Sequence, residues 1–87
     1  MKFTLYSDPG HGWLKVSKKL LNELNIADKI SSYSYQRKDD AFLEEDCDLS
    51  VFFDAMNAKG RTIEYRYQIT NKTSKIRKYE SYKNEKI

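Results

Sequence analysis

Alternating hydrophobic and polar positions predict a β-hairpin at the start of the chain. Phe3 and Leu5 alternate with other residues as in a half-buried strand, and residues 13–16 return as a second strand. Between them, residues 8–12 contain Pro9 and two glycines, which favour a turn because proline fixes φ and glycine permits positive φ.

The same alternation predicts a second hairpin and two further strands. Tyr33 and Tyr35 alternate with polar residues, residues 37–40 form a polar turn, and residues 41–44 form the returning strand. The most regular alternation lies in residues 62–70, where one face of a strand carries Ile63, Tyr65, Tyr67 and Ile69. Residues 75–79 are predicted to form a short last strand.

Two segments have the hydrophobic spacing of short helices. The first begins after Ser17, a good N-cap, and ends at Asn25, which tolerates the left-handed conformation; its apolar residues are Leu20, Leu21 and Leu24. The second begins after a cap at Asp46 or Asp48 and ends at Gly60; its apolar face carries Leu49, Phe52, Phe53 and Met56.

The predicted order of elements is ββαββαβ(β). We therefore expect one small α+β domain over residues 1–79, with two short helices packed on a mainly antiparallel sheet. Residues 80–87 have too few apolar side chains to fold independently and are predicted to fray as a polar tail.

Length and composition exclude several classes of function. A chain of 87 residues buries only a small core, so a deep cofactor pocket is not expected and no cofactor is predicted. The single cysteine excludes an internal disulfide. The sequence contains no apolar run of membrane-spanning length and no apolar region of a secretory signal, which predicts a cytoplasmic protein without membrane contact.

The net charge of +3 conceals a strong separation of charge along the chain. Residues 39–54 carry seven acids and no base, whereas residues 1–38 carry seven bases and three acids and residues 61–87 carry eight bases and three acids. Part of the acidic run suits the start of a helix, where negative charge favours the helix dipole. Such a dipolar molecule can present different surfaces to different partners.

The acidic run has two interpretations. In the first it is a solvated face with helix caps; in the second it is a surface that recognises a basic partner, formed by Asp39, Asp40, Glu44 and Glu45. A metal site is not predicted, because the run lacks the spacing of a calcium loop and adjacent strand residues point to opposite faces.

The basic carboxyl half suggests a nucleic-acid interface as an alternative. Cations that bind phosphate and rings that stack on bases occur close together there: Arg61, Tyr65, Arg66, Tyr67, Lys75, Arg77 and Lys78. The same pattern is common in ordinary sheets, and no recognised nucleic-acid-binding motif accompanies it.

An enzyme is the third interpretation, with His11 as a general base and Cys47 as a nucleophile brought near it by folding. Asp8 or Asp46 would be the orienting carboxylate. The acids that flank Cys47 argue against catalysis, because negative charge raises a thiol pKa and suppresses the thiolate. The sequence therefore predicts no enzyme and no catalytic residue.

Several words of the sequence resemble a family of small proteins encoded by bacteriophages and bacterial mobile elements. The words are residues 7–14 (SDPGHGWL), residues 26–31 leading to 33–35 (IADKIS, YSY), residues 43–48 (LEEDCD), and Ile76-Arg77 before Tyr79. The resemblance implies a setting in which small charged proteins are often inhibitors of host defence, anti-CRISPR proteins among them. We therefore predict a non-enzymatic interaction protein that binds a host protein or ribonucleoprotein complex.

Overall fold

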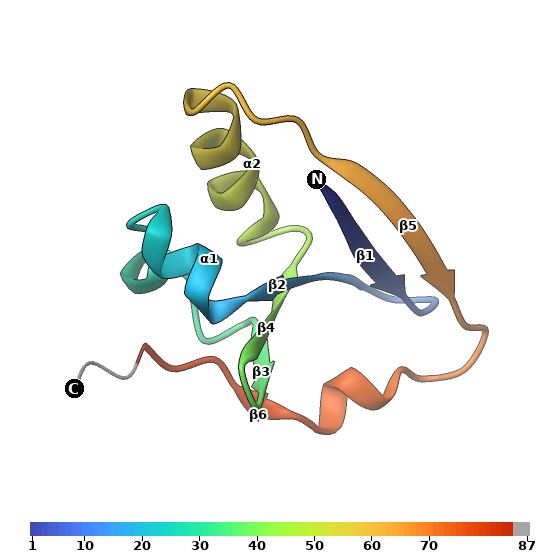
Figure 1. The fold of residues 1–87 in the computed structure, drawn as a ribbon. Helices are drawn as coiled ribbons and strands as arrows, with labels where there is room; N and C mark the ends of the chain where they lie inside the picture. The colour runs from blue at the N-terminus through green and yellow to red at the C-terminus, as the bar shows by residue number, and fades with distance from the viewer. Residues whose placement is uncertain (85–87) are drawn as a thin grey trace.

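Six strands form one mixed sheet in the computed structural model, which describes residues 1–84 (Figure 1). The order across the sheet is β5-β1-β2-β4-β3-β6, and all neighbours pair antiparallel except β1 and β5, which are parallel. The strands are β1 (Lys2–Ser7), β2 (Gly12–Ser17), β3 (Tyr35–Arg37), β4 (Asp40–Glu44), β5 (Glu64–Ile69) and β6 (Glu80–Ser81). The predicted α+β class is confirmed.

Both predicted hairpins are present. In the first, β1 pairs with β2 and Leu5 lies opposite Leu14. In the second, β3 pairs with β4 around a tight turn in which Lys38 has a φ of 55°. Because β2 also pairs with β4, the two hairpins form the centre of the sheet.

Two helices follow the hairpins, as predicted. Helix α1 (Lys18–Glu23) begins where the Ser17 hydroxyl accepts a hydrogen bond from the Leu20 N–H, and α2 covers Leu49–Ala58. Positive φ angles at Asn25 (58°) and Gly60 (68°) follow the two helices, as their residue types indicate.

The prediction was wrong on two details of α2. Asp48 occupies the N-cap position, yet its side chain makes no capping hydrogen bond because it binds two serines elsewhere. Phe53 is 48% exposed, whereas Phe52 and Met56 are buried, so the buried face of the helix is narrower than expected.

The carboxyl-terminal segment differs from the prediction. Residues expected to form a last strand form a 3-10 helix, η2 (Lys75–Lys78), and the short strand β6 follows within the expected polar tail. Tyr82 is buried and donates a hydrogen bond from its hydroxyl to the Ala27 carbonyl, in the 3-10 helix η1 (Ala27–Lys29). The tail is therefore packed through Tyr82, and residues 85–87 of the predicted frayed segment lie outside the described residues.

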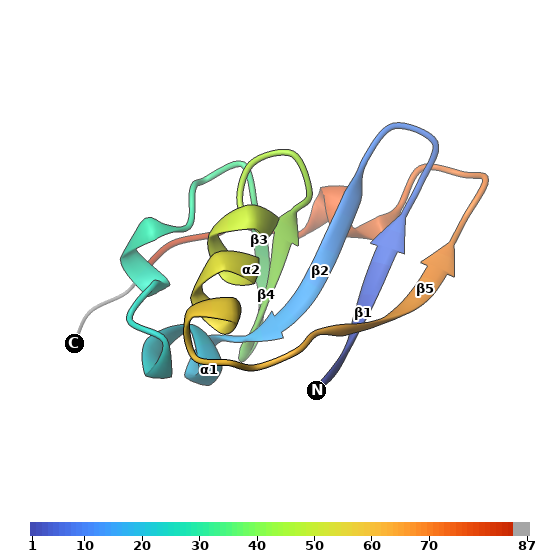
Figure 2. The ribbon, with the colours of Figure 1, turned by 90° about the horizontal axis from the view of Figure 1, so that it is seen from above.

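The sheet separates two hydrophobic clusters. On one face, α1, α2 and η1 cover the main core, in which Leu14, Leu43 and Phe52 are completely buried (Figure 2). On the other face, η2 covers a smaller cluster of Trp13, Phe42 and Ile76. This second cluster forms the base of the candidate site.

Strand β5 is only partly covered. The two helices lie near β3 and β4, away from β5 (Figure 2). Tyr67 and Ile69 of β5 are therefore 63% and 75% exposed. The apolar face predicted for residues 62–70 is therefore packed at Ile63 and Tyr65 and exposed beyond them. No helix within residues 1–84 has the length and apolar character that a membrane span requires.

Candidate functional site

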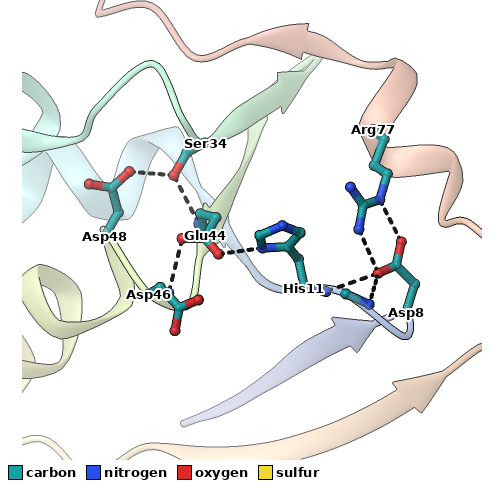
Figure 3. A network of polar contacts seen from close by, with 8 residues as sticks. Asp8, His11, Ser34, Glu44, Asp46, Asp48 and Arg77 are labelled. Atoms are coloured by element: carbon teal, nitrogen blue, oxygen red, sulfur yellow. Dashed lines mark hydrogen bonds and ion pairs between the residues drawn. The ribbon is translucent and has the colours of Figure 1, made fainter.

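Four segments that are distant in the sequence line one pocket at the η2 face of the sheet. We call it the Trp13 pocket. It lies where the β1–β2 turn meets the end of β4, the segment before β3, and η2. Figure 3 shows four of its residues, His11, Glu44, Asp46 and Arg77. Its lining residues are His11, Trp13, Tyr33, Tyr35, Glu44, Asp46, Cys47 and Arg77.

Asp8 attaches the β1–β2 turn to η2. Its carboxylate accepts hydrogen bonds from the N–H groups of Gly10, His11 and Ser74, at 2.9–3.0 Å, and from two nitrogens of Arg77, at 2.7 and 2.9 Å (Figure 3). The Arg77 guanidinium, followed by the Ser74 N–H, holds the pKa of Asp8 far below its usual range. The Asp8 side chain is 1% exposed and the Arg77 side chain is 34% exposed, so the carboxylate is buried while the guanidinium reaches the surface.

Gly10 allows the β1–β2 turn to lie close to the Arg77 guanidinium. Among the described glycines only Gly60 has a positive φ, so the sequence-based reason for the glycines of this turn was wrong. A Cβ at Gly10 would lie 2.8 Å from Nη2 of Arg77, a distance that real Cβ contacts essentially never show. A glycine here lets the turn contact the Asp8–Arg77 pair.

Arg77 lies over the indole ring of Trp13. The guanidinium carbon is 5.3 Å from the ring centre, a cation–π geometry, while the same guanidinium binds Asp8. Trp13 is 2% exposed, and its indole Nε1 is the one buried side-chain nitrogen or oxygen of the described chain that has no hydrogen-bond partner. Buried donors normally have a partner, so this indole N–H is an exception among the described residues.

Glu44 is a buried carboxylate at the wall of the pocket. Its side chain is 8% exposed, and Oε1 lies 3.2 Å from Nδ1 of His11. Oε2 accepts a hydrogen bond from the Asp46 N–H at 3.0 Å. Within residues 1–84 no lysine or arginine forms an ion pair with Glu44, so His11 is its only candidate for a cationic partner.

A second polar cluster fixes the backbone of Glu44. The Ser34 hydroxyl donates to the Asp48 carboxylate and accepts from the Glu44 N–H at 2.9 Å (Figure 3). Asp48 also accepts hydrogen bonds from the N–H and hydroxyl of Ser31. Asp48 thereby joins the segment before β3 to the start of α2 and holds Glu44 in place.

Folding brings His11 and Cys47 to the same pocket, which the sequence could not show. The pKa of the Cys47 thiol is raised by hydrogen bonding to Glu44, by desolvation, and by the charges of Glu44, Asp48 and Asp46. The thiolate, the reactive species, is therefore disfavoured. The arrangement is therefore poorly suited to nucleophilic catalysis by Cys47.

We expect Cys47 to react slowly with iodoacetamide in the folded protein. Because its pKa is raised, the thiolate fraction at pH 7.5 should be lower than in the urea-unfolded chain, and labelling should be about 3-fold slower or more. Mass spectrometry of timed samples measures both rates. Faster labelling of the folded protein would indicate an activated thiol and contradict this description.

The structure does not bring the predicted acidic surface together. Asp40 and Glu44 are the first and last residues of β4, so Asp39 and Asp40 lie at one end of the strand and Glu44 and Glu45 at the other. Asp40 is also 3.7 Å from Lys15 in an ion pair, and Glu44 is buried in the pocket. The residues that could act together are Glu44 and its neighbour Asp46.

The predicted nucleic-acid residues are also divided. Tyr65 and Tyr67 lie beside Phe3 and Leu5 on the helical face of the sheet, while Arg66 lies between them in sequence and points to the opposite face. Lys75 and Lys78 belong to η2, across the sheet from the two tyrosines, and Arg61 precedes β5. Arg77 is paired with Asp8. Rings and cations therefore do not form one platform.

Sequence reasoning missed Trp13, Tyr33 and Tyr35 as site residues, and it considered Asp8 only as a carboxylate that could orient His11. All eight residues that line the Trp13 pocket lie within the sequence segments quoted above. Comparisons of the chain with protein-family models, curated proteins and solved structures found no match.

Proposed function

We propose that the protein is a non-enzymatic interaction protein whose Trp13 pocket and its rim form the recognition surface. The partner is a host protein or ribonucleoprotein complex, in keeping with the mobile-element setting that the sequence words imply. Inhibition of a host defence system is the activity that suits this setting. The observation that carries the proposal is the convergence of four chain segments on one hydrogen-bonded pocket.

Tyr33 supplies the pocket with an exposed anchor. Its side chain is 72% exposed at the rim, and its backbone is fixed by the Ser31 hydroxyl, which accepts a hydrogen bond from the Tyr33 N–H. Tyrosine is enriched among the residues that dominate binding energy, because its ring buries a large area and its hydroxyl can stay hydrated. A rigid pocket beside an exposed tyrosine is suited to a docking partner.

The chemistry of the pocket supports binding over turnover. The raised pKa of Cys47 disfavours its thiolate, and Nδ1 of His11 lies 3.2 Å from an oxygen of the Glu44 carboxylate. Arg77 is held in place by Asp8 and contacts Trp13, so its charge is fixed in position. Fixed donors and acceptors around an open pocket provide specificity in a protein interface.

We expect Tyr33→Ala to lose the partner that the wild-type protein captures from host extract. Tyr67→Ala is the matched control, because Tyr67 is 63% exposed and lies on β5, away from the pocket. Quantitative mass spectrometry should show one complex enriched by wild type and by Tyr67→Ala and depleted at least about 5-fold with Tyr33→Ala.

Two results would contradict the proposed function. One is equal capture of the same complex by Tyr33→Ala, provided that its melting temperature matches the wild type. The other is a turnover activity of the purified protein that disappears on substitution of His11 or Cys47.

A further inference from the structure

We propose that His11, Glu44 and Asp46 form a binding site for a divalent transition-metal ion of the zinc type in the Trp13 pocket. One imidazole nitrogen and one oxygen from each carboxylate all lie within 4.8 Å of one another. The sequence predicted no metal site, because the acidic run lacks the spacing of a calcium loop and adjacent strand residues point to opposite faces. Folding supplies the proximity that spacing did not reveal.

The distances are close to those of a coordination sphere. Ligand atoms that each lie 2.0–2.2 Å from one zinc ion are about 3–3.5 Å from each other. Nδ1 of His11 and Oε1 of Glu44 are already 3.2 Å apart. Asp46 is exposed in the loop between β4 and α2, so a rotation of its side chain can bring its oxygen to the same centre.

Electrostatics favour a cation at this position. Glu44 is buried and has no lysine or arginine partner within residues 1–84, while the nearby Arg77 is engaged by Asp8. A buried carboxylate without a fixed counter-charge is costly, and a divalent ion would provide that charge. Mixed imidazole and carboxylate ligands favour zinc-type ions over calcium or magnesium, which prefer oxygen alone.

The indole of Trp13 is a second feature of this pocket, because a lining residue carries a hydrogen-bond donor without a partner. Its Nε1–H is buried and has no partner in the described chain, although Trp13 lines the same pocket. Such donors are rare because an unmade buried hydrogen bond is unfavourable. An ion with three protein ligands keeps a position for water or an anion, and either can accept a hydrogen bond.

The ligands are held by groups outside the proposed coordination sphere. The Asp8 carboxylate accepts a hydrogen bond from the His11 N–H, and the Ser34 hydroxyl accepts one from the Glu44 N–H. Such supporting contacts limit the rearrangement that binding requires. The role of the ion in partner recognition rests on the proposed function, in which the open position of the ion would receive a donor atom of the partner. Ion binding itself is a property of the isolated chain.

Isothermal titration of tag-free protein with zinc chloride tests the site. We expect one ion per chain, with affinity reduced by about 100-fold or more in His11→Ala and about 10-fold or more in Asp46→Asn. Glu45→Gln, which removes the same charge from a neighbouring residue outside the cluster, should keep the affinity within about 2-fold. Cys47→Ser should also bind normally, because the thiol is not a ligand in this arrangement.

Three outcomes would overturn the metal site. They are no heat of binding at millimolar zinc, unchanged affinity in His11→Ala, and loss of affinity in Cys47→Ser, which would assign the ion to the thiol. Melting temperatures of all variants without metal establish that each is folded. Failure of this titration leaves the partner capture with Tyr33→Ala unaffected, so the two proposals can fail separately.

Discussion

Replacing Asp8 with alanine should lower the melting temperature by about 10 °C or more, which is among the larger effects expected for a single substitution. The change removes the acceptor for three backbone N–H groups and for Arg77 at once. The buried N–H groups would lose their acceptor, and the partly exposed Arg77 guanidinium would lose its counter-charge. Thermal unfolding followed by circular dichroism measures the shift.

The matched variant Arg77→Met should lower the melting temperature less. Asp8 would keep its hydrogen bonds from the Gly10, His11 and Ser74 N–H groups, and methionine would still cover Trp13. The double variant should be no less stable than Asp8→Ala alone, because both changes remove the same interaction. Additive losses would contradict the assignment of Arg77 as a partner of Asp8.

Asp8 should also contribute to acid sensitivity. Its pKa is lowered in the folded state, so its stabilising effect is complete above the unfolded pKa of about 4 and is lost as pH falls below that value. The difference in stability between wild type and Asp8→Asn should therefore be largest at neutral pH and shrink below about pH 4. A constant difference from pH 2 to pH 7 would contradict the depressed pKa.

Replacing Asp48 with alanine should reduce the free energy of unfolding by about 2–4 kcal/mol. The Asp48 carboxylate accepts hydrogen bonds from Ser31 and Ser34, and Ser34 in turn accepts the Glu44 N–H. Without Asp48, buried donors lose their partner and the backbone of Glu44 loses its support. Urea unfolding gives the change in free energy.

Asp54→Ala is the control for this prediction. Asp54 is an exposed acid of α2, so its replacement should change stability by about 0.5 kcal/mol or less. Similar losses from the two variants would contradict the stabilising role assigned to the hydrogen bonds of Asp48.

Local sequence patterns predicted the helices and hairpins whose formation depends on residues close to them in the sequence. Ser17, Asn25 and Gly60 identified helix ends, because capping depends on the residue type at the end of a helix. Alternation of apolar and polar residues identified both hairpins, because successive side chains of a strand point to opposite faces. Phe53 was misplaced because two short helices cover only part of the sheet. The width of that cover is a tertiary property.

The carboxyl-terminal segment required knowledge of tertiary contacts. Residues 75–78 form η2 because Ser74 caps it and Arg77 reaches Asp8, 69 residues earlier in the chain. Tyr82 packs against the rest of the fold because its ring is buried and its hydroxyl donates a hydrogen bond to the Ala27 carbonyl. Neither partner is visible in the local sequence, which reads as a basic strand and a polar tail.

The candidate site was predicted only in fragments. His11 and Cys47 were considered together as a catalytic pair, and Glu44 was considered as part of an acidic run that was treated as continuous although β4 separates Asp39 and Asp40 from Glu45. The pairing of Asp8 with Arg77 and the role of Trp13 were not predicted, because only folding brings Arg77 near these two residues.

Binding of the purified partner to two surface variants tests the central claim most directly. If the Trp13 pocket is the recognition surface, Tyr33→Ala should raise Kd by about 10-fold or more, as loss of a dominant contact does. The double variant Asp39→Lys/Asp40→Lys, at the far end of β4, should stay within about 3-fold of wild type, as expected for charges outside the contact. The opposite pattern, with binding lost on charge reversal and kept in Tyr33→Ala, would contradict the account. It would assign recognition to the end of β4 at which Asp39 and Asp40 lie.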